Sequence, residues 1–256
     1  MPHADLNGIR IRYDVEGSGP AVLLSHGYSA TGRMWDAQRT ALADRYRVIS
    51  WDMRGHGATE CPDDPGCYSA DATVADMKAL LDHLGVARAV VGGLSLGGYV
   101  SLAFFLAHPA MVRALVLADT GPGFRNPEAR AAWNRRAEER AQELETRGLE
   151  ALAGRSREMR EAMGDHRSAR SLALAARGML AQQDARVIDG LASVRMPTLI
   201  VVGDRDEPFL APTRYMASKI AGSRLEVIED AGHSANLDQP DAFNRILRSF
   251  LDSLPA

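Results

Sequence analysis

A serine at position 95 has the surroundings of a catalytic nucleophile. It lies in Gly93-Leu94-Ser95-Leu96-Gly97, after an apolar segment at residues 87–91 and before a helical pattern at residues 96–107. A strand-turn-helix context exposes such a hydroxyl on a strained turn, and the helix N-terminus favours a developing anion. A dinucleotide-binding fingerprint would need glycine at position 95, and a phosphate-binding loop would need a nearby lysine. We therefore expect Ser95 to act as a nucleophile.

A serine nucleophile needs a base within hydrogen-bonding distance. The chain has seven histidines, and His233 fits best because it follows the last predicted strand in the loop Ala231-Gly232-His233. The other six fit less well. His83 lies in a predicted helix, His108 at a helix end, His166 in the segment 121–191 and His3 near the N-terminus, and two glycine-containing loops hold His26 and His56. We predict that His233 accepts the proton of Ser95.

An acidic side chain should orient the histidine, and four positions are candidates. Asp204, Asp206 and Glu207 follow a predicted strand at residues 198–202, and Asp119 ends the strand predicted at residues 112–118. The order serine, acid, histidine is the one found in this type of strand-turn-helix site. We favour Asp206, with Asp119 and Asp204 as alternatives. Asp204 could instead be a turn residue that bonds the backbone.

An oxyanion hole completes such a site with two backbone N–H groups. One donor is expected from the residue after the nucleophile, which is Leu96. The second is expected from the loop after an early strand, which points to Tyr28 in His26-Gly27-Tyr28.

The predicted elements alternate between strands and helices, which indicates βαβ units and a mostly parallel sheet. Strands are expected at residues 9–15, 21–25, 46–51, 87–91, 112–118, 198–202 and 224–228. Helices are expected at residues 33–45, 72–84, 96–107, 211–220 and 240–254. Residues 121–191 are rich in Arg, Glu and Ala, and we expect only helices there, at 127–147 and 168–183. The charged faces of these helices are interpreted as solvent-exposed.

Composition excludes several other classes of protein. The chain has 256 residues, 46% of them hydrophobic, and a formal net charge of -3, so no electrostatic footprint for nucleic acid is visible. The N-terminal residues do not resemble a signal peptide, and residues 89–112, although free of charge, contain glycines and a proline that suit a strand and a helix better than a membrane span. We expect a cytoplasmic protein with no metal or organic cofactor. Cys61 and Cys67 are interpreted as reduced thiols, and no pattern indicates an oligomeric state.

Five motifs occur in the order found in the α/β-hydrolase superfamily, and the chain resembles that superfamily along nearly its whole length. They are His26-Gly27, Asp52-Met53-Arg54-Gly55-His56-Gly57, the turn around Ser95, Gly203-Asp204-Arg205-Asp206 and Gly232-His233. The resemblance implies an eight-stranded, mostly parallel sheet formed by residues 1–120 and 192–256, with a helical cap at residues 121–191. It selects Asp206 as the acid, and assigns His56 to a structural loop and His26 to the oxyanion turn.

Within that superfamily, the first half looks most like the 3-oxoadipate enol-lactonase and small carboxylesterase group. The resemblance rests on residues 33–36, 46–49 and 81–85 together with Gly93-Leu94-Ser95. It implies hydrolysis of a small-molecule ester or lactone through an acyl-enzyme. Cap residues Phe124, Trp133 and Met179 are candidates for substrate contacts.

Other activities on the same fold remain open as alternatives. Carbon–carbon bond hydrolases often have Asn where this chain has Leu94, and menaquinone-pathway lyases have Arg where it has Tyr99, although residues 121–124 resemble the lyases. Cofactor-free haloperoxidases typically have Trp in place of Tyr28. A hydrolase-fold binder with little turnover is a further alternative, but it would have no need of an activated serine.

Overall fold

The computed structural model describes residues 2–255 and has one sheet of eight strands at its centre. The strands are β1 (His3–Leu6), β2 (Ile9–Glu16), β3 (Ala21–Ser25), β4 (Arg47–Trp51), β5 (Ala89–Leu94), β6 (Val112–Ala118), β7 (Thr198–Gly203) and β8 (Arg224–Ile228). Their order is β1-β2-β4-β3-β5-β6-β7-β8. Only the β1–β2 and β2–β4 pairs are antiparallel. The predicted fold is therefore confirmed.

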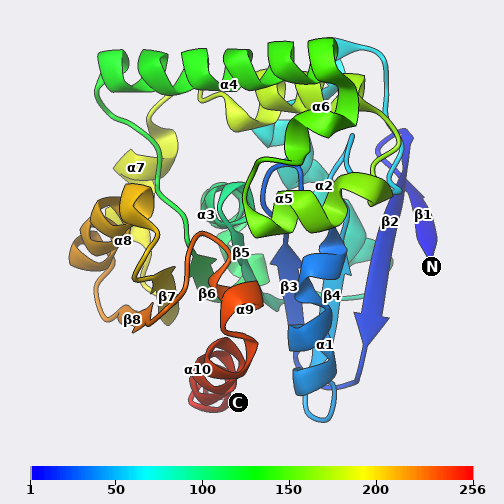
Figure 1. Ribbon diagram of the computed structural model, residues 1–256. Coiled ribbons are helices and arrows are strands. Elements are labelled where there is room, and N and C mark those ends of the chain that lie inside the picture. Colours follow the sequence, from blue (N-terminus) through cyan, green and yellow to red (C-terminus); the bar gives the residue numbers. More distant parts are fainter. Residues whose placement is uncertain (1, 256) are drawn as a thin grey trace.

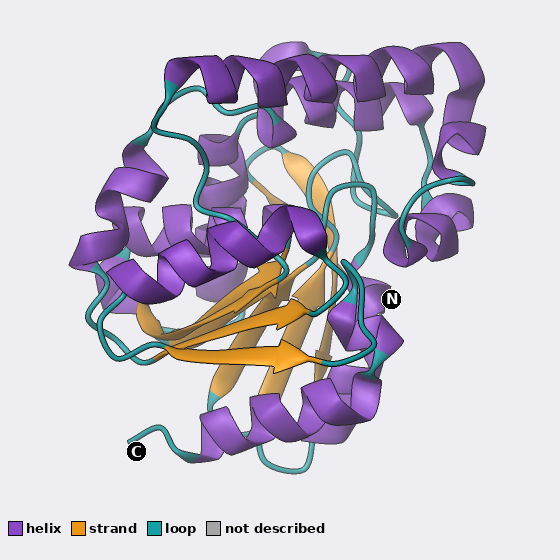
Figure 2. Ribbon diagram, turned by 60° about the vertical axis from the view of Figure 1, so that its left-hand side comes forward, coloured by secondary structure: helices purple, strands orange, loops and turns teal. Residues whose placement is uncertain are grey.

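Helices cover both faces of this sheet because its central strands are apolar on both sides. Every residue of β3, β5 and β7 is buried. One face packs against α2 (Ala70–His83), α3 (Leu96–Ala107) and α8 (Glu207–Lys219), and the other against α1 (Asp36–Leu42), α9 (Ala235–Asp238) and α10 (Pro240–Asp252). Figure 2 shows the sheet between these layers. Short 3-10 turns occur at Gly32–Trp35, Pro65–Cys67 and Pro109–Met111.

The chain between β6 and β7 contains only helices in the part that the structure describes. They are α4 (Pro127–Arg147), η4 (Gly148–Leu152), α5 (Arg157–Ala162), η5 (Met163–Asp165), α6 (Ala169–Ala175), the π-helical turn η6 (Ala176–Leu180), α7 (Arg186–Gly190) and η7 (Leu191–Ser193). Figure 1 shows α4 lying across the top of the molecule, with α5 and α6 between it and the sheet. We propose that residues 121–191 act as a cap, although α7 packs against α3 beside the sheet.

The long helix α4 has the bounds that its sequence predicts. The Asn126 side chain accepts hydrogen bonds from the backbone N–H groups of Glu128 and Ala129, and Pro127 occupies the first helical position. The helix ends at Arg147, and the next residue, Gly148, has a φ of 65° that suits glycine. This rigid 21-residue element spans the whole upper side of the cap.

The structure adds one strand and adjusts the bounds of several helices. His3, placed near the N-terminus and outside any predicted element by the sequence analysis, lies in β1, which pairs with β2 through a turn at Asn7 and Gly8, both with positive φ. The helix predicted at residues 211–220 starts at Glu207 and accommodates Pro212. The helix predicted at residues 168–183 divides into α6 and the π-helical turn η6 and ends at Leu180.

Within residues 2–255, no helix combines the length and the apolar composition needed to cross a membrane. Cys61 and Cys67 are both free thiols.

Candidate active site

Ser95 lies in a strained turn between β5 and α3. Its φ of 54° and ψ of -116° place a non-glycine residue in a region that costs about 1–3 kcal/mol. The turn is held by two hydrogen bonds: the Ser95 N–H donates to the Ala118 carbonyl at 3.0 Å, and the Thr120 hydroxyl donates to the Ser95 carbonyl at 2.6 Å. Backbone strain stabilised by its surroundings is typical of functional sites.

The glycines on either side of Ser95 allow β3 to approach this turn closely. A Cβ atom on Gly93 would lie 2.5 Å from the Ser25 carbonyl oxygen, and one on Gly97 would lie 2.1 Å from the same atom. Any side chain at either position would therefore push the strand and the helix apart. The motif is thus a packing requirement of the turn that presents Ser95.

His233 and Asp206 are joined in the loops that follow β8 and β7. The Nδ1–H of His233 donates to Oδ2 of Asp206 at 2.9 Å, and Asp206 is only 4% exposed. Burial disfavours the imidazolium, but the hydrogen bond and charge of Asp206, with the charges of Glu158 and Asp119, raise the pKa of His233 above its usual 6.5. The Phe209 ring packs against the imidazole, with the ring centroids 4.7 Å apart.

The two alternative acids bond to backbone groups instead of to His233. Asp119 is fully buried, and its carboxylate accepts hydrogen bonds from the N–H groups of Gly203 (2.8 Å) and Ala235 (3.2 Å). It thereby ties the loop that carries Asp206 to the loop that carries His233, and burial raises its pKa well above the usual value. Asp204 accepts from the N–H of Ala231. The geometry therefore favours Asp206 as the partner of the imidazole.

The two predicted oxyanion donors are not used within the protein. Neither the Tyr28 N–H nor the Leu96 N–H makes a hydrogen bond to any residue that the structure describes. Leu96 is the first residue of α3, where the N–H has no partner in the helix. Tyr28 is anchored at its other end, because its hydroxyl donates to the Leu172 carbonyl in α6 at 2.8 Å.

The turn that carries Tyr28 is braced by two buried imidazoles. His26 accepts from the Met53 N–H at Nε2 and bonds its own neighbour Gly27 through Nδ1; burial lowers its pKa to about 4. His166, from the cap, accepts from the Gly57 N–H and donates to the carbonyl of Ser29, whose φ is 57°. Both imidazoles are held neutral, so they serve structural roles here.

Ser95, Asp206 and His233 line one cavity. It has a volume of about 420 Å³, and a second cavity of about 320 Å³ also has Ser95 in its wall. No hydrogen bond joins the Ser95 hydroxyl to the His233 ring within the described part of the chain. Such bonds are often long without substrate and tighten when it binds.

The two cavities differ in chemistry and meet at Ser95. We call the smaller one the apolar arm, lined chiefly by Leu96, Tyr99, Phe124, Trp133, Leu180, Phe209 and Pro212. We call the larger one the arginine arm, whose wall contains Arg136, Arg140, Arg155, Tyr28, Met159 and the Asp206–His233 pair. Ser95, Trp133, Arg136, Leu180, Pro208 and Phe209 belong to both walls.

The cap residues predicted to contact substrate fall into two groups. Phe124 and Trp133 line the apolar arm, with ring centroids 5.9 Å apart. Met179 is fully buried in the hydrophobic core and lines neither arm, so the sequence prediction for this residue needs correction. Leu180 lies in the wall instead, and its carbonyl accepts a hydrogen bond from the Trp133 indole.

The arginines were missed because the helical segment was interpreted as solvent-exposed. A signal exists in α4: Trp133, Arg136, Ala137 and Arg140 follow the spacing i, i+3, i+4, i+7, which puts them on one helical face. Ala137 is buried on that face, and all four residues line the arginine arm.

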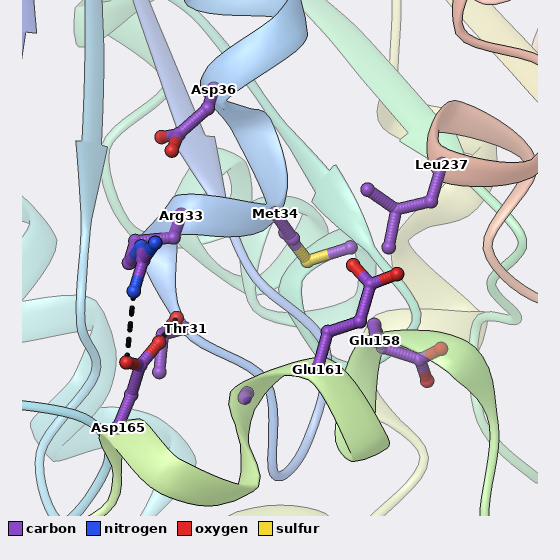
Figure 3. Close-up of a pocket in the computed structure, with 9 residues that line it drawn as sticks. Thr31, Arg33, Met34, Asp36, Glu158, Glu161, Asp165 and Leu237 are labelled. Carbon is purple, nitrogen blue, oxygen red and sulfur yellow. Dashed lines mark hydrogen bonds and ion pairs between the residues drawn. The ribbon is translucent and has the colours of Figure 1, made fainter.

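A third cavity, of about 210 Å³, lies between the cap and the loop after β3 and contains neither Ser95 nor His233. We call it the carboxylate cavity, because Asp36, Glu158, Glu161 and Asp165 line it together with Thr31, Arg33, Met34 and Leu237. Figure 3 shows these side chains and the 3.0 Å ion pair between Arg33 and Asp165. No group of three or more His, Cys, Asp or Glu side chains among the described residues could hold a metal ion, here or elsewhere.

Comparisons with known proteins match the chain over most of its length. The model of the alpha/beta hydrolase family matches residues 22–246. A Bacillus subtilis protein provisionally named 2-succinyl-6-hydroxy-2,4-cyclohexadiene-1-carboxylate synthase is 28% identical, covering 95% of this chain and 96% of that protein. The 3-oxoadipate enol-lactonase 2 of Acinetobacter baylyi is 29% identical, covering 91% of this chain and 88% of the enzyme. A thermophilic esterase from Thermogutta terrifontis has a similar solved structure, with a TM-score of 0.85, 30% identity and 100% coverage of both chains.

Proposed function

Because the chain belongs to the alpha/beta hydrolase family, we propose that it is a serine hydrolase that cleaves carboxylic esters or lactones of small molecules. The observation that carries this proposal is the cavity in which Ser95 meets the hydrogen-bonded pair Asp206 and His233. The similar esterase and enol-lactonase support this type of substrate.

In the proposed reaction, His233 takes the proton of Ser95 as the serine oxygen attacks the substrate carbonyl. The negative charge that develops on the carbonyl oxygen is stabilised by the N–H groups of Leu96 and Tyr28, each worth roughly 3–4 kcal/mol. Collapse of this intermediate expels the alcohol, which receives the proton from His233, and leaves an acyl group on Ser95. Water activated by His233 then releases the acid and restores the serine.

The environment of His233 suits this cycle of accepting and returning a proton. Asp206 fixes the ring with Nδ1 protonated, so that Nε2 is free to act as the base. Its raised pKa makes the imidazole a stronger base than an exposed histidine. Asp119 acts in this proposal as a positioning residue, through the backbone of both loops.

The direct test is hydrolysis of 4-nitrophenyl butyrate by the purified protein beside its Ser95→Ala variant. Loss of the nucleophile is expected to lower kcat by about 10⁴ to 10⁶. A fluorophosphonate probe should add one label to Ser95 in the wild type, located by peptide mass spectrometry, and none in the variant. Equal rates for the two proteins would contradict the proposal.

A second candidate is an elimination or carbon–carbon bond cleavage by the same three residues. The similarity to the Bacillus subtilis protein and the arginines near Ser95 favour it. Rapid mixing with 4-nitrophenyl butyrate distinguishes the two reactions. A burst of nitrophenol equal to the enzyme concentration, with the butyryl group recovered on Ser95, supports the hydrolase. Fluorophosphonate labelling of Ser95 with no ester turnover supports the second candidate.

A further inference from the structure

The arginine arm carries positive charge that the protein itself does not neutralise. Arg155 forms an ion pair with Glu143, but the side chains of Arg136 and Arg140 make no hydrogen bond or ion pair with any residue between 2 and 255. Among the described residues that line this arm, Asp206 is the only carboxylate, and it is engaged by His233. The side chains of Arg140 and of the exposed Arg136 therefore border the cavity without an ion pair, and the charge of Glu158 acts on Arg140 from outside the cavity wall.

Arg140 is the more enclosed of these two arginines. Its side chain is half-buried, and this burial lowers its pKa. The charges of Arg155 and Arg136 act in the same direction, whereas Tyr28 and the charge of Glu158 act against it. Withdrawing a guanidinium from water without a partner costs free energy, and a bound anion would offset that cost. A bound anionic ligand would therefore account for an arginine without an ion pair in this cavity.

The position of Ser95 indicates where the arginines would lie relative to the scissile carbonyl of a bound substrate. The nucleophile lies where the arginine arm and the apolar arm meet. Phe124 and Pro212 are found only in the wall of the apolar arm, and Arg140 only in that of the arginine arm. A substrate whose carbonyl is at Ser95 can thus place one substituent against apolar rings and the other against guanidinium groups.

We propose that the substrate is an ester or lactone with a carboxylate on one side of the scissile carbonyl and an apolar group on the other. Arg140, assisted by Arg136, binds the carboxylate, since a guanidinium offers two parallel N–H donors that match its two oxygens. The apolar group occupies the apolar arm beside Trp133. This inference rests on the proposed function and adds the charge and polarity of the substrate to it.

The test compares two esters that differ in one charge: 4-nitrophenyl hydrogen glutarate and its neutral methyl ester. For each ester, kcat/KM is divided by the rate constant for its hydrolysis by hydroxide, which corrects for intrinsic reactivity. The anion preference is this corrected value for the anionic ester divided by that for the neutral ester. We expect an anion preference above about tenfold in the wild type, from one or two charge-assisted hydrogen bonds. Added salt should reduce it, because the arm is open to solvent.

Arg140→Met is expected to bring the anion preference close to one, and Arg136→Met to lower it by less. The matched control is Arg135→Met, since Arg135 is an exposed arginine of the same helix that lines neither arm; it should keep the wild-type preference. A preference near one in the wild type, or one that Arg140→Met leaves unchanged, would overturn the inference.

A binding measurement on Ser95→Ala separates this inference from the proposed function and does not depend on the folding of an Arg140 variant. Glutarate binding followed by calorimetry should weaken as salt is added. Failure of both esters to show Ser95-dependent turnover would contradict the proposed function, whereas salt-sensitive glutarate binding would still support the anion site. Turnover of the neutral ester without glutarate binding or anion preference would contradict the anion site alone.

Discussion

The arginine arm and the carboxylate cavity are both lined by cap residues from the segment 155–162, and they differ in how their charges are compensated. Each carboxylate in Figure 3 has a partner: Asp36 pairs with Arg39, Glu161 with Arg157 and Asp165 with Arg33, while Glu158 accepts hydrogen bonds from Ser156 and Ser234. In the arginine arm, Arg136 and Arg140 have no partner among the residues that the structure describes. A cavity in which every carboxylate has an ion-pair or hydrogen-bonding partner acts as a seam between cap and core. A cavity whose charges are unpaired, next to a nucleophile, is suited to bind a ligand.

The largest difference in kcat is expected between two variants that each replace one carboxylate, one beside the arginine arm and one in the carboxylate cavity. Asp206→Asn is expected to lower kcat by about 10⁴, because the imidazole loses the partner that fixes its tautomer. Asp165→Asn, in the carboxylate cavity, should leave kcat close to the wild-type value. Ester hydrolysis measures both. A larger loss in Asp119→Asn than in Asp206→Asn would reassign the acid.

The stability contributed by the loop between the two cavities should decrease at acidic pH. Tyr28 of the arginine arm and Thr31 of the carboxylate cavity belong to the same loop as Ser29, whose carbonyl accepts a hydrogen bond from His166, and His26 begins that loop. Both histidines have a pKa lowered by burial from 6.5, that of His26 to about 4. The unfolded chain therefore binds more protons below pH 6.5, and stability is lost as the pH falls from 6.5 towards 4, by about 3 kcal/mol for His26 alone.

Urea unfolding at a series of pH values measures this loss. The variant His166→Gln keeps a donor and an acceptor at the same place but cannot titrate, so its free energy of unfolding should depend less on pH than that of the wild type. An identical pH dependence in the two proteins would show that His166 does not contribute.

Glu158 tests whether the two cavities are electrostatically separate. It lines the carboxylate cavity, yet its charge helps to raise the pKa of His233. Glu158→Gln should therefore lower that pKa and move the acidic limb of kcat/KM to lower pH, with a gain at acidic pH of less than about tenfold. Glu161→Gln, from the same cavity, is the control and should leave the limb in place. A shift of the limb to higher pH in Glu158→Gln would contradict this reasoning.

The smallest effect is expected at the ion pair drawn in Figure 3. Arg33 is 58% exposed, so its pair with Asp165 should contribute less than about 1 kcal/mol. Arg33→Ala should change the urea midpoint slightly and leave kcat unaltered. A marked loss of kcat would mean that this seam controls the position of the cap over Ser95.

The parts of the molecule predicted well from the sequence are those determined by local physical chemistry. The glycines around Ser95 mark a tight turn, and Asn126, Pro127 and Gly148 fix the ends of α4. The strand β1 was missed, although Asn7-Gly8 is a recognised hairpin signal.

The orientation of the cap residues could not be predicted in the same way. Arg136 and Arg140 look solvent-exposed because alanine and arginine form only a weak amphipathic pattern, and the tertiary contacts of α4 determine which side faces the sheet. Met179 lies in the π-helical turn η6, and its side chain is buried in the hydrophobic core instead of lining either arm. The charge of the arginine arm thus depends on which face of α4 packs towards the sheet, and the i, i+3, i+4, i+7 spacing in this helix is only a weak signal of that face.

The helix α4 carries residues of both arms on a single stretch of chain, whereas the proposed catalytic residues lie on three loops of the sheet. Trp133, Arg136, Ala137 and Arg140 form one helical face, remote in sequence from Ser95, Asp206 and His233. The residues proposed to select the substrate can therefore change during evolution without changes in the residues proposed to carry out catalysis. A combinatorial library at these four positions would sample new substrate preferences while every loop that bears the catalytic apparatus keeps its sequence.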